Sequence, residues 1–232
     1  METLFQDLWK LIAEPGNLRE NLALMVQHSG FLTYAGLFLI VFCETGLVVT
    51  PFLPGDSLLF VAGFVCATVE HSAAEQHVAP AVSGPVMALI LIAAAVLGDG
   101  VNYHVGRWLG PVAFSGRFRW LKREHLERTH AFFEKHGGRA IVLARFVPIV
   151  RTFAPFVAGI GSMRYTQFLA YNVLGAVLWV GLLMGAGYWL GGLDWVQRHF
   201  EKVVIGIVVV SLLPLVWEWW KARTLQRSQA NP

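Results

Sequence analysis

The sequence has few charged residues and very little cysteine. Only 14% of its 232 residues are Asp, Glu, Lys or Arg, whereas an ordinary soluble domain carries about 25%. This deficit, together with 56% hydrophobic residues and a mean hydropathy of +0.55, excludes a disordered chain and argues against a water-soluble fold. The two cysteines, Cys43 and Cys66, lie in apolar segments, so they form neither a disulfide framework nor a zinc-binding pattern.

The sequence also lacks the motifs of common enzymes. It contains no nucleophile–base motif, no glycine-rich nucleotide-binding loop and no set of metal ligands. We therefore expect no enzymatic activity, no cofactor and no metal. The net charge of +3 does not indicate nucleic-acid binding, because the basic residues lie between apolar runs, where they set membrane topology.

Asp, Glu, Lys and Arg are absent from three segments that we interpret as full membrane spans. These segments run from Gln76 to Gly98, from Tyr165 to Leu193 and from Val203 to Trp217. The first two are long enough to span a hydrocarbon core of about 30 Å, and the third reaches that length with the following tryptophans as interfacial anchors. The sequence therefore predicts an all-α polytopic membrane protein with about three full transmembrane helices.

Two further apolar segments are interrupted by proline, glycine and charge. The first extends from about residue 31 to 69, and the second from 140 to 161. Irregular backbone inside a membrane is tolerated only where it is buried in protein or lines a wet cavity. We therefore interpret both segments as re-entrant helix–break–helix hairpins. The predicted breaks lie at Pro51, Pro54, Gly55, Pro148 and Pro155.

Short motifs recur in the two halves of the chain. FVAG at 60–63 returns at 156–159, and GRWLG at 106–110 returns as GYWLG at 187–191. The same order of hairpin, FVAG and glycine-rich helix in both halves indicates a duplicated unit. Since we expect the first hairpin to open outward and the second inward, the duplication predicts an inverted repeat.

The distribution of basic residues predicts the orientation in the membrane. Eight of the 18 Lys and Arg residues lie between Arg107 and Arg139, whereas the segment 70–85 contains none. Because cytoplasmic loops are enriched in Lys and Arg, we expect the segment 107–139 and the basic C-terminus in the cytoplasm and the segment 70–85 outside.

The same features divide the chain into three parts. We expect amphipathic interfacial helices at 1–30, a membrane core at 31–192, and a final transmembrane helix with a basic tail at 193–232. A further amphipathic helix is expected at 116–139, where apolar residues alternate with bases that would attract anionic lipid.

Four charged residues flank the predicted breaks. Glu44 and Asp56 belong to the first hairpin, and Arg145 and Arg151 belong to the second. If the hairpins of an inverted repeat meet tip to tip, two carboxylates and two guanidinium groups gather inside the membrane with no net charge. One interpretation is that these groups neutralise each other and hold the hairpins together; the other is that they form a binding site.

The chemistry of these groups favours a site for an anionic headgroup. Arginine offers a fork of donors that fits phosphate or carboxylate oxygens, so Arg145 and Arg151 can form a clamp. Burial favours the neutral form of a carboxyl group and a nearby arginine favours the charged form, so Glu44 or Asp56 can exchange a proton. Protonation would release the arginines for an anionic ligand and deprotonation would eject it, which would couple headgroup movement to a proton gradient.

Further polar residues lie on the predicted long helices. Asp99, Tyr103 and Arg107 follow one another at four-residue steps on one helix face. Asp99 is either a further proton site or an arginine partner, whereas Arg107 is typical of an anchor at the membrane surface. Asn172 and Trp179 share a face of another helix, where they either contact a hairpin or serve helix packing.

Several motifs in a fixed order give the chain from about Phe31 to Gly192 its most specific signature. They are E-x-G-L (44–47), F-L-P-G-D-S-L-L (52–59), G-D-x-x-x-Y-x-x-G-R-W-L-G (98–110), K-H-G (135–137), R-F-x-P-x-V-R-T (145–152), A-G (158–159) and N-x-x-G-x-x-x-W (172–179). Together they resemble the DedA family of membrane proteins, whose core is also called the VTT or SNARE-associated domain. The P-G-D form is most similar to the bacterial branch associated with proton-dependent envelope maintenance and cationic-peptide resistance.

This resemblance implies essential acids at Glu44 and Asp56 and essential arginines at Arg145 and Arg151. It also implies lipid transport in the bacterial inner membrane, which in some members returns undecaprenyl phosphate to the cytoplasmic leaflet. The expected partners are membrane lipids, an anionic lipid phosphate and protons, and a homo-oligomer is compatible with these. The alternatives are a flippase or scramblase for phosphatidylethanolamine or other phospholipids, a small-ion/proton antiporter, and a structural membrane assembly protein.

Overall fold

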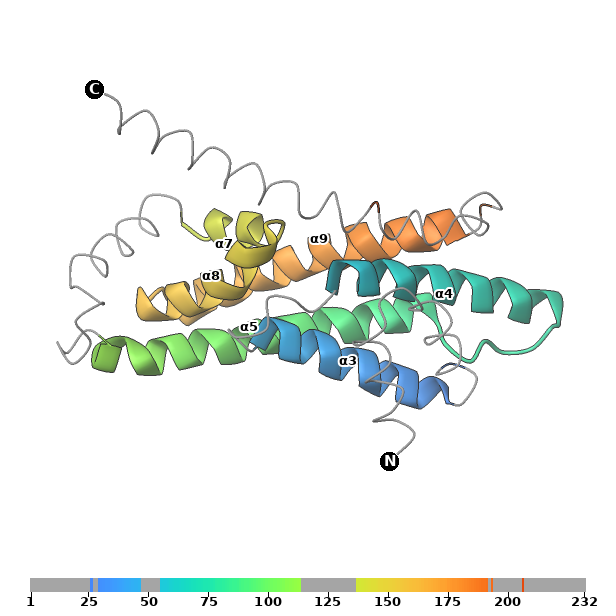
Figure 1. The fold of residues 1–232 in the computed structure, drawn as a ribbon, viewed down its shortest axis with the longest axis horizontal. Helices are drawn as coiled ribbons and strands as arrows, with labels where there is room; N and C mark the ends of the chain where they lie inside the picture. The colour runs from blue at the N-terminus through green and yellow to red at the C-terminus, as the bar shows by residue number, and fades with distance from the viewer. Residues whose placement is uncertain are drawn as a thin grey trace, which may run out of the picture.

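The described part of the chain is entirely helical. The computed structural model describes residues 26, 29–46, 55–113, 137–191, 193 and 206. No strand occurs in these ranges, whose helices are α3 (Gly30–Gly46), α4 (Gly55–Glu75), α5 (Gly84–Ala113), α7 (Arg139–Ala144), α8 (Pro148–Ile160) and α9 (Tyr165–Gly191) (Figure 1). The prediction of an all-α fold is therefore confirmed.

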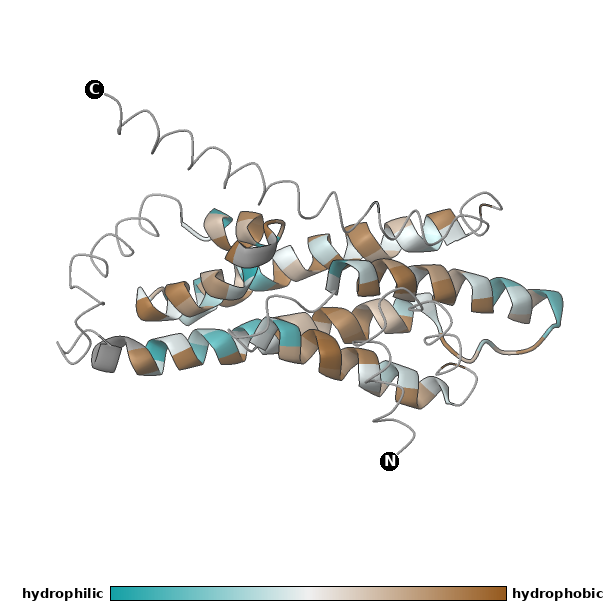
Figure 2. Cartoon of the chain, viewed as in Figure 1, coloured by the Kyte–Doolittle hydropathy of each residue, from teal (hydrophilic) through white to brown (hydrophobic). Residues whose placement is uncertain are grey.

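Three described helices, α4, α5 and α9, are long and apolar enough to cross a membrane. Helix α5 has 30 residues and α9 has 27, which correspond to lengths of about 45 and 40 Å and exceed the hydrocarbon thickness. These two helices contain most of the predicted charge-free segments at 76–98 and 165–193. Their surfaces are largely hydrophobic, but a hydrophilic stretch lies midway along α5 (Figure 2).

Helix α4 differs from the expectation because it continues to Glu75, beyond the predicted hairpin boundary at residue 69. With 21 residues it is long enough to cross a membrane, and not merely to form the second arm of a hairpin. Asp56 and Glu70 lie toward its two ends, so its central turns carry no charge. Every residue from Leu58 to Cys66 is buried, as expected for a helix that other helices surround. The re-entrant course of the first hairpin stays a prediction.

The second predicted hairpin contains one break. Helix α7 ends at Ala144 and α8 begins at Pro148, so the break falls at residues 145–147. Proline is favoured at the first position of a helix because its missing N–H would have no partner there. Pro155 was predicted as a second break, and this is wrong because Pro155 lies inside α8. A buried proline is tolerated within a membrane helix where neighbouring groups satisfy the freed backbone.

Several sequence predictions fall on residues that the structure does not describe. Among the first-hairpin breaks, Gly55 is the first residue of α4, whereas Pro51 and Pro54 lie outside the described residues. The segments 1–30 and 193–232 and most of 116–139 also lie largely or wholly outside them. The helices expected there, and the proposed division of the chain, stay predictions.

The repeated motifs make equivalent close contacts between helices. Gly63 of α4 lies so near α9 that a Cβ atom would overlap the carbonyl oxygen of Met184, and Gly187 of α9 lies equally near the carbonyl of Phe60. Only residues without a side chain allow two helix backbones to approach in this way. The first FVAG motif therefore packs against the second glycine-rich motif.

The other pair of motifs repeats this arrangement. Gly159 of α8 lies against the carbonyl of Tyr103 on α5, and Gly106 of α5 lies against the carbonyl of Phe156. In Figure 1, α5 and α9 run in opposite directions, as do α4 and α8. The fold is therefore an inverted repeat in which α4 and α8 each pack against the long helix of the other half.

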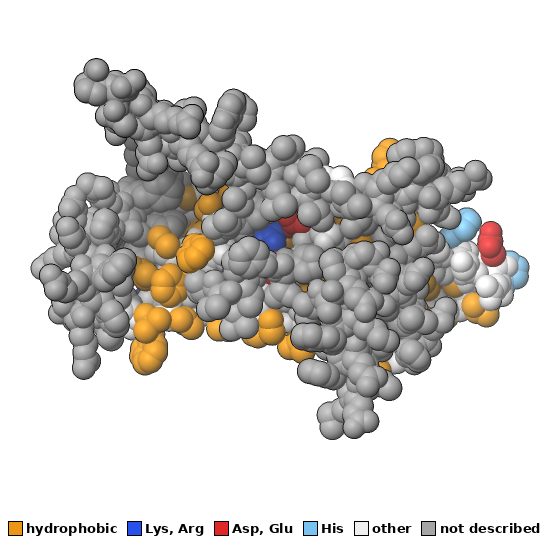
Figure 3. Space-filling view, viewed as in Figure 1, with side chains coloured by type: hydrophobic (Ala, Val, Ile, Leu, Met, Phe, Trp, Pro, Cys, Tyr) orange, Lys and Arg blue, Asp and Glu red, His pale blue; other side chains and the backbone are white. Residues whose placement is uncertain are grey.

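Hydrogen bonds to Glu70 join three helices at the end of the molecule that contains the connection between α4 and α5. The Glu70 carboxylate accepts one hydrogen bond from the Gly84 amide at 2.7 Å and another from the Tyr188 hydroxyl at 2.5 Å. These bonds join α4, the first residue of α5 and α9. Histidine and acidic side chains are exposed at this end (Figure 3), including His71 and Glu75. The turn between α8 and α9 lies at the opposite end (Figure 1).

Candidate functional site

A buried ion-pair network joins the two halves of the protein. Arg151 of α8 donates one hydrogen bond to Asp56 at the start of α4 and another to Glu44 near the end of α3. The side chains of Arg151 and Glu44 are 8% and 1% exposed, and that of Asp56 is 18% exposed. One guanidinium group therefore bridges α3 and α4.

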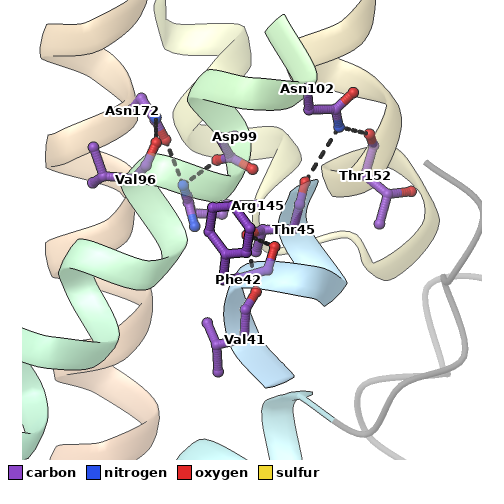
Figure 4. Close-up of polar contacts among 9 residues, drawn as sticks. All are labelled: Val41, Phe42, Thr45, Val96, Asp99, Asn102, Arg145, Thr152 and Asn172. Carbon is purple, nitrogen blue, oxygen red and sulfur yellow. Dashed lines mark hydrogen bonds and ion pairs between the residues drawn. The ribbon is translucent and has the colours of Figure 1, made fainter. Parts of the chain in front are cut away.

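A second ion pair lies beside the first. Arg145, in the break between α7 and α8, donates hydrogen bonds to Asp99 of α5 and to Asn172 of α9 (Figure 4). The Asn172 amide in turn donates to the Val96 carbonyl at 3.1 Å. Asp99 is therefore an arginine partner in the structure, and its expected role as a proton site stays a prediction. Asn172 likewise contacts a residue of the second hairpin.

Trp179 connects the two ion pairs. Its indole Nε1 donates a hydrogen bond to Asp56 at 3.0 Å. The Cζ atoms of Arg151 and Arg145 lie 5.1 and 5.7 Å from the centre of its ring. Both distances allow an attraction between the cation and the aromatic face. The two like charges therefore share one aromatic side chain.

The network differs from the predicted set in one respect. The sequence predicts two carboxylates and two guanidinium groups, but Asp99 joins them as a third carboxylate. One carboxylate is therefore in excess when all five groups are ionised. The sequence marked Asp99 as a proton site or an arginine partner but could not place it in the network, because Asp99 belongs to a long helix and meets Arg145 only after α5 packs against α8.

Some polar atoms of the network have no partner. Among the described residues, the buried side-chain atoms without a hydrogen bond are Glu44 Oε2, Asn102 Oδ1, Arg145 Nε and Arg151 Nε. Leaving such a group unpaired costs about 1–3 kcal/mol, so an unpaired group in a native site calls for a ligand, a water or another functional reason. Each arginine thus has a donor available beyond its carboxylate partners.

Glycine allows two of the network residues to fit. At Gly55, the first residue of α4, a Cβ atom would overlap the Glu44 carboxylate. At Gly175 of α9, a Cβ atom would come within 3.2 Å of Arg145 Nε. The Pro-Gly-Asp sequence therefore serves two purposes: its glycine makes room for one acid, and its aspartate supplies another.

Sequence reasoning missed Asn102, which is fully buried in α5. Its amide nitrogen donates to the carbonyl of Thr152 at 2.7 Å and lies 3.3 Å from the carbonyl of Thr45 (Figure 4). A signal was present in the sequence, because Asn102 stands midway between Gly98 and Gly106 at four-residue steps, on the face that those glycines open to neighbouring helices.

Tyr103 and Arg107, predicted as supporting residues, lie outside the ion-pair network. The buried Tyr103 hydroxyl donates to the Met163 carbonyl and accepts a hydrogen bond from Arg107 at 3.2 Å. The Tyr103 ring also stacks on Phe168, with 4.4 Å between ring centres. These contacts fasten α5 to the turn between α8 and α9. Arg107 is exposed, which is compatible with an anchor at the membrane surface.

The described residues contain no group of three or more His, Cys, Asp or Glu side chains that could hold a metal ion. The groups present in the network are guanidinium and carboxylate groups. Guanidinium forks can bind an anion, and carboxylates can compete for those forks or take up protons.

The chain matches known proteins over most of its length. A family model for the VTT domain matches residues 50–189. The chain is 53% identical over 199 residues to Protein DedA of Escherichia coli K12, a match that covers 85% of this chain and 87% of that protein. It is 33% identical over 218 residues to the inner membrane protein YqjA of the same strain, covering 94% and 92%. It is 43% identical over 186 residues to an uncharacterized membrane protein of Mycobacterium tuberculosis, covering 80% and 78%. No solved structure matches the chain.

Proposed function

The chain belongs to the DedA family of VTT-domain membrane proteins, and we propose that it is a proton-coupled translocase that moves undecaprenyl phosphate across the bacterial inner membrane. It is a multi-pass membrane protein, with three apolar helices of sufficient length and a relative named as an inner membrane protein. The observation that carries the proposal is Arg151, a buried guanidinium shared by Glu44 and Asp56.

Phosphate is the natural competitor for these carboxylates. Its oxygens accept the same parallel hydrogen bonds from a guanidinium fork that a carboxylate accepts. The unpaired Nε atoms of Arg145 and Arg151 are additional donors for it. Because both guanidinium groups lie within 5.7 Å of the Trp179 ring centre, an anion that binds between them also relieves the repulsion of two like charges.

The charge balance explains why protons take part. With three carboxylates and two guanidinium groups, the network already has one acid in excess. An anionic headgroup would add further negative charge at a site from which water is largely removed, which is costly. Protonation of Glu44 or Asp56 removes a competing charge and frees one arm of the Arg151 fork. Loss of the proton restores the ion pair and drives the headgroup out.

The test is movement of radiolabelled undecaprenyl phosphate between the leaflets of proteoliposomes, with and without an imposed pH gradient. We expect the gradient to stimulate the wild type and not Glu44→Gln, because glutamine cannot exchange a proton. Glu75→Gln is the matched control, since Glu75 is an exposed acid at the end of α4, and it should respond to the gradient like the wild type.

Other outcomes would assign a different function. Movement that neither the gradient nor Glu44→Gln affects would indicate passive scrambling. No movement of undecaprenyl phosphate, together with movement of labelled phosphatidylethanolamine in the same proteoliposomes, would favour a phospholipid flippase. Proton flux driven by small ions in liposomes without the labelled lipid would favour an antiporter.

A further inference from the structure

We infer that Asn102 is a positioning residue that sets the geometry of the Glu44–Arg151 ion pair. Its amide nitrogen reaches the carbonyls of Thr45 at 3.3 Å and Thr152 at 2.7 Å. Each of these residues directly follows one member of the ion pair in the chain. One side chain on α5 thus binds the backbone next to Glu44 of α3 and the backbone next to Arg151 of α8.

The Thr45 carbonyl lacks an amide donor within its helix, and the Thr152 carbonyl lies next to a carbonyl that lacks one. Thr45 is the penultimate residue of α3, so its carbonyl is among the last four of the helix, which have no amide donor within the helix. On α8, Pro155 has no N–H to donate to the carbonyl four residues earlier, that of Arg151. The Asn102 amide therefore donates to a carbonyl at the end of α3 and to a carbonyl of α8 that adjoins the one left without a donor by Pro155.

The neighbouring glycines bring these backbones within reach of a short side chain. One turn before Asn102, Gly98 lies so close to α3 that a Cβ atom would overlap the Thr45 hydroxyl. One turn after it, Gly106 lies equally close to the Phe156 carbonyl of α8. Helix α5 is thus in close contact with both elements around Asn102.

The second half of the repeat has no equivalent amide. Alignment of the two glycine-rich motifs places Leu183 of α9 opposite Asn102.

The other ion pair has its own asparagine. Asn172 accepts from Arg145 and donates to the Val96 carbonyl, and neither contact involves α3. A change at Asn102 should therefore disturb the Glu44–Arg151 pair and leave the Arg145–Asp99 pair in place. A change at Asn172 should do the reverse. This division separates a positioning role from a general loss of stability.

The experiment measures how readily each buried acid reacts with dicyclohexylcarbodiimide, an apolar reagent that modifies protonated carboxyl groups and spares ion-paired ones. The full-length protein in liposomes is labelled at one pH, and mass spectrometry quantifies labelling at Glu44 and Asp99. In Asn102→Leu we expect Glu44 labelling to rise about fivefold, the population change that matches loss of one ordinary hydrogen bond. Asp99 labelling should stay as in the wild type.

Asn172→Leu is the matched control, and we expect it to raise labelling of Asp99 and not of Glu44. Equal increases at both acids in Asn102→Leu, or no increase at Glu44, would overturn the inference. If Asn102→Leu does not fold, Asn102→Ser decides, because its hydroxyl keeps one donor and should give a smaller increase at Glu44 alone. The assay contains no undecaprenyl phosphate, so its result is independent of the proposed substrate.

Discussion

At Arg151, a single guanidinium group meets carboxylates from two helices, α3 and α4, the first of which ends at Gly46 and the second of which begins at Gly55. The fork geometry matters, because each carboxylate receives its own N–H from a different terminal nitrogen. A lysine ammonium is a compact point charge and cannot present two donors in fixed directions. Arginine at this position can therefore bind the acids of α3 and α4 at the same time, whereas lysine cannot.

We predict that Arg151→Lys loses lipid transport by at least about tenfold while the protein still inserts and folds, because the charge remains but the fork does not. Transport in proteoliposomes and the amount of monodisperse protein in detergent measure the two effects. Arg164→Lys, the same exchange at an exposed arginine, is the control and should transport normally. Normal transport by Arg151→Lys would show that the fork is not required.

Tyr103 allows a test of the polar contacts outside the network. We predict that Tyr103→Phe lowers the free energy of unfolding by about 1–3 kcal/mol, because the buried Met163 carbonyl loses its donor. Thermal unfolding in detergent measures the change. Tyr165→Phe, at a tyrosine that is 40% exposed, should shift stability by less than about 0.5 kcal/mol. Equal effects of the two substitutions would mean that the Tyr103 hydroxyl bond contributes little.

At the scale of helices, close contacts through glycine decide which elements are neighbours. Helix α4 packs against α9, and α8 packs against α5, through the same pair of motifs. Each contact brings backbone against backbone, so a side chain at the glycine cannot be accommodated by a rotamer change. Helix association in a membrane relies on such contacts, because burial of apolar surface gives little driving force there.

We therefore predict that Gly187→Ala destabilises the protein by about 1–3 kcal/mol, since the added methyl group would overlap the Phe60 carbonyl and force the helices apart. Gly181→Ala on the same helix is the control, because no atom of another described element lies within 4 Å of the position a Cβ would take. It should be neutral or slightly stabilising, since alanine favours helix over glycine. Unfolding midpoints in detergent compare the two, and a neutral Gly187→Ala would contradict the close contact.

At the scale of the whole molecule, the inverted repeat places the two helix turns at opposite ends. The α4–α5 turn lies just before Gly84, whereas Gly159, close to the α8–α9 turn, packs beside Tyr103 more than four turns further along α5. Figure 1 shows the same separation. The charged network lies between these ends, where residues from both halves meet. This is the arrangement in which a central site can be reached from either leaflet in turn.

We predict that these turns face opposite sides of the membrane. In a variant without Cys43 and Cys66, Val78→Cys in the α4–α5 turn should react with an impermeant maleimide added to intact cells without an outer membrane. Ser162→Cys in the α8–α9 turn should react only after the inner membrane is opened. Both residues are exposed, so burial does not decide the result. Labelling of both from the same side would contradict the inverted topology.

The sequence allowed the main acids and arginines to be predicted because charge inside an apolar run is rare and costly. It also predicted the break before Pro148, since proline starts helices. It misassigned Pro155, because sequence alone does not reveal whether neighbouring helices can satisfy an interrupted backbone. It passed over Asn102, because the spacing of that amide between Gly98 and Gly106 places it on a contact face but does not reveal which groups accept its hydrogen bonds.

By itself, the sequence determined an all-helical membrane protein, the inverted repeat and the residue types of the buried charged network, because hydropathy, motif order and charge are local properties of the chain. The tertiary structure decided the pairing: Arg151 meets Glu44 and Asp56, Arg145 meets Asp99, and an amide on α5 joins α3 to α8. These choices depend on how closely the glycines let helices approach. Distances between residues 46 to 107 positions apart follow only from that packing.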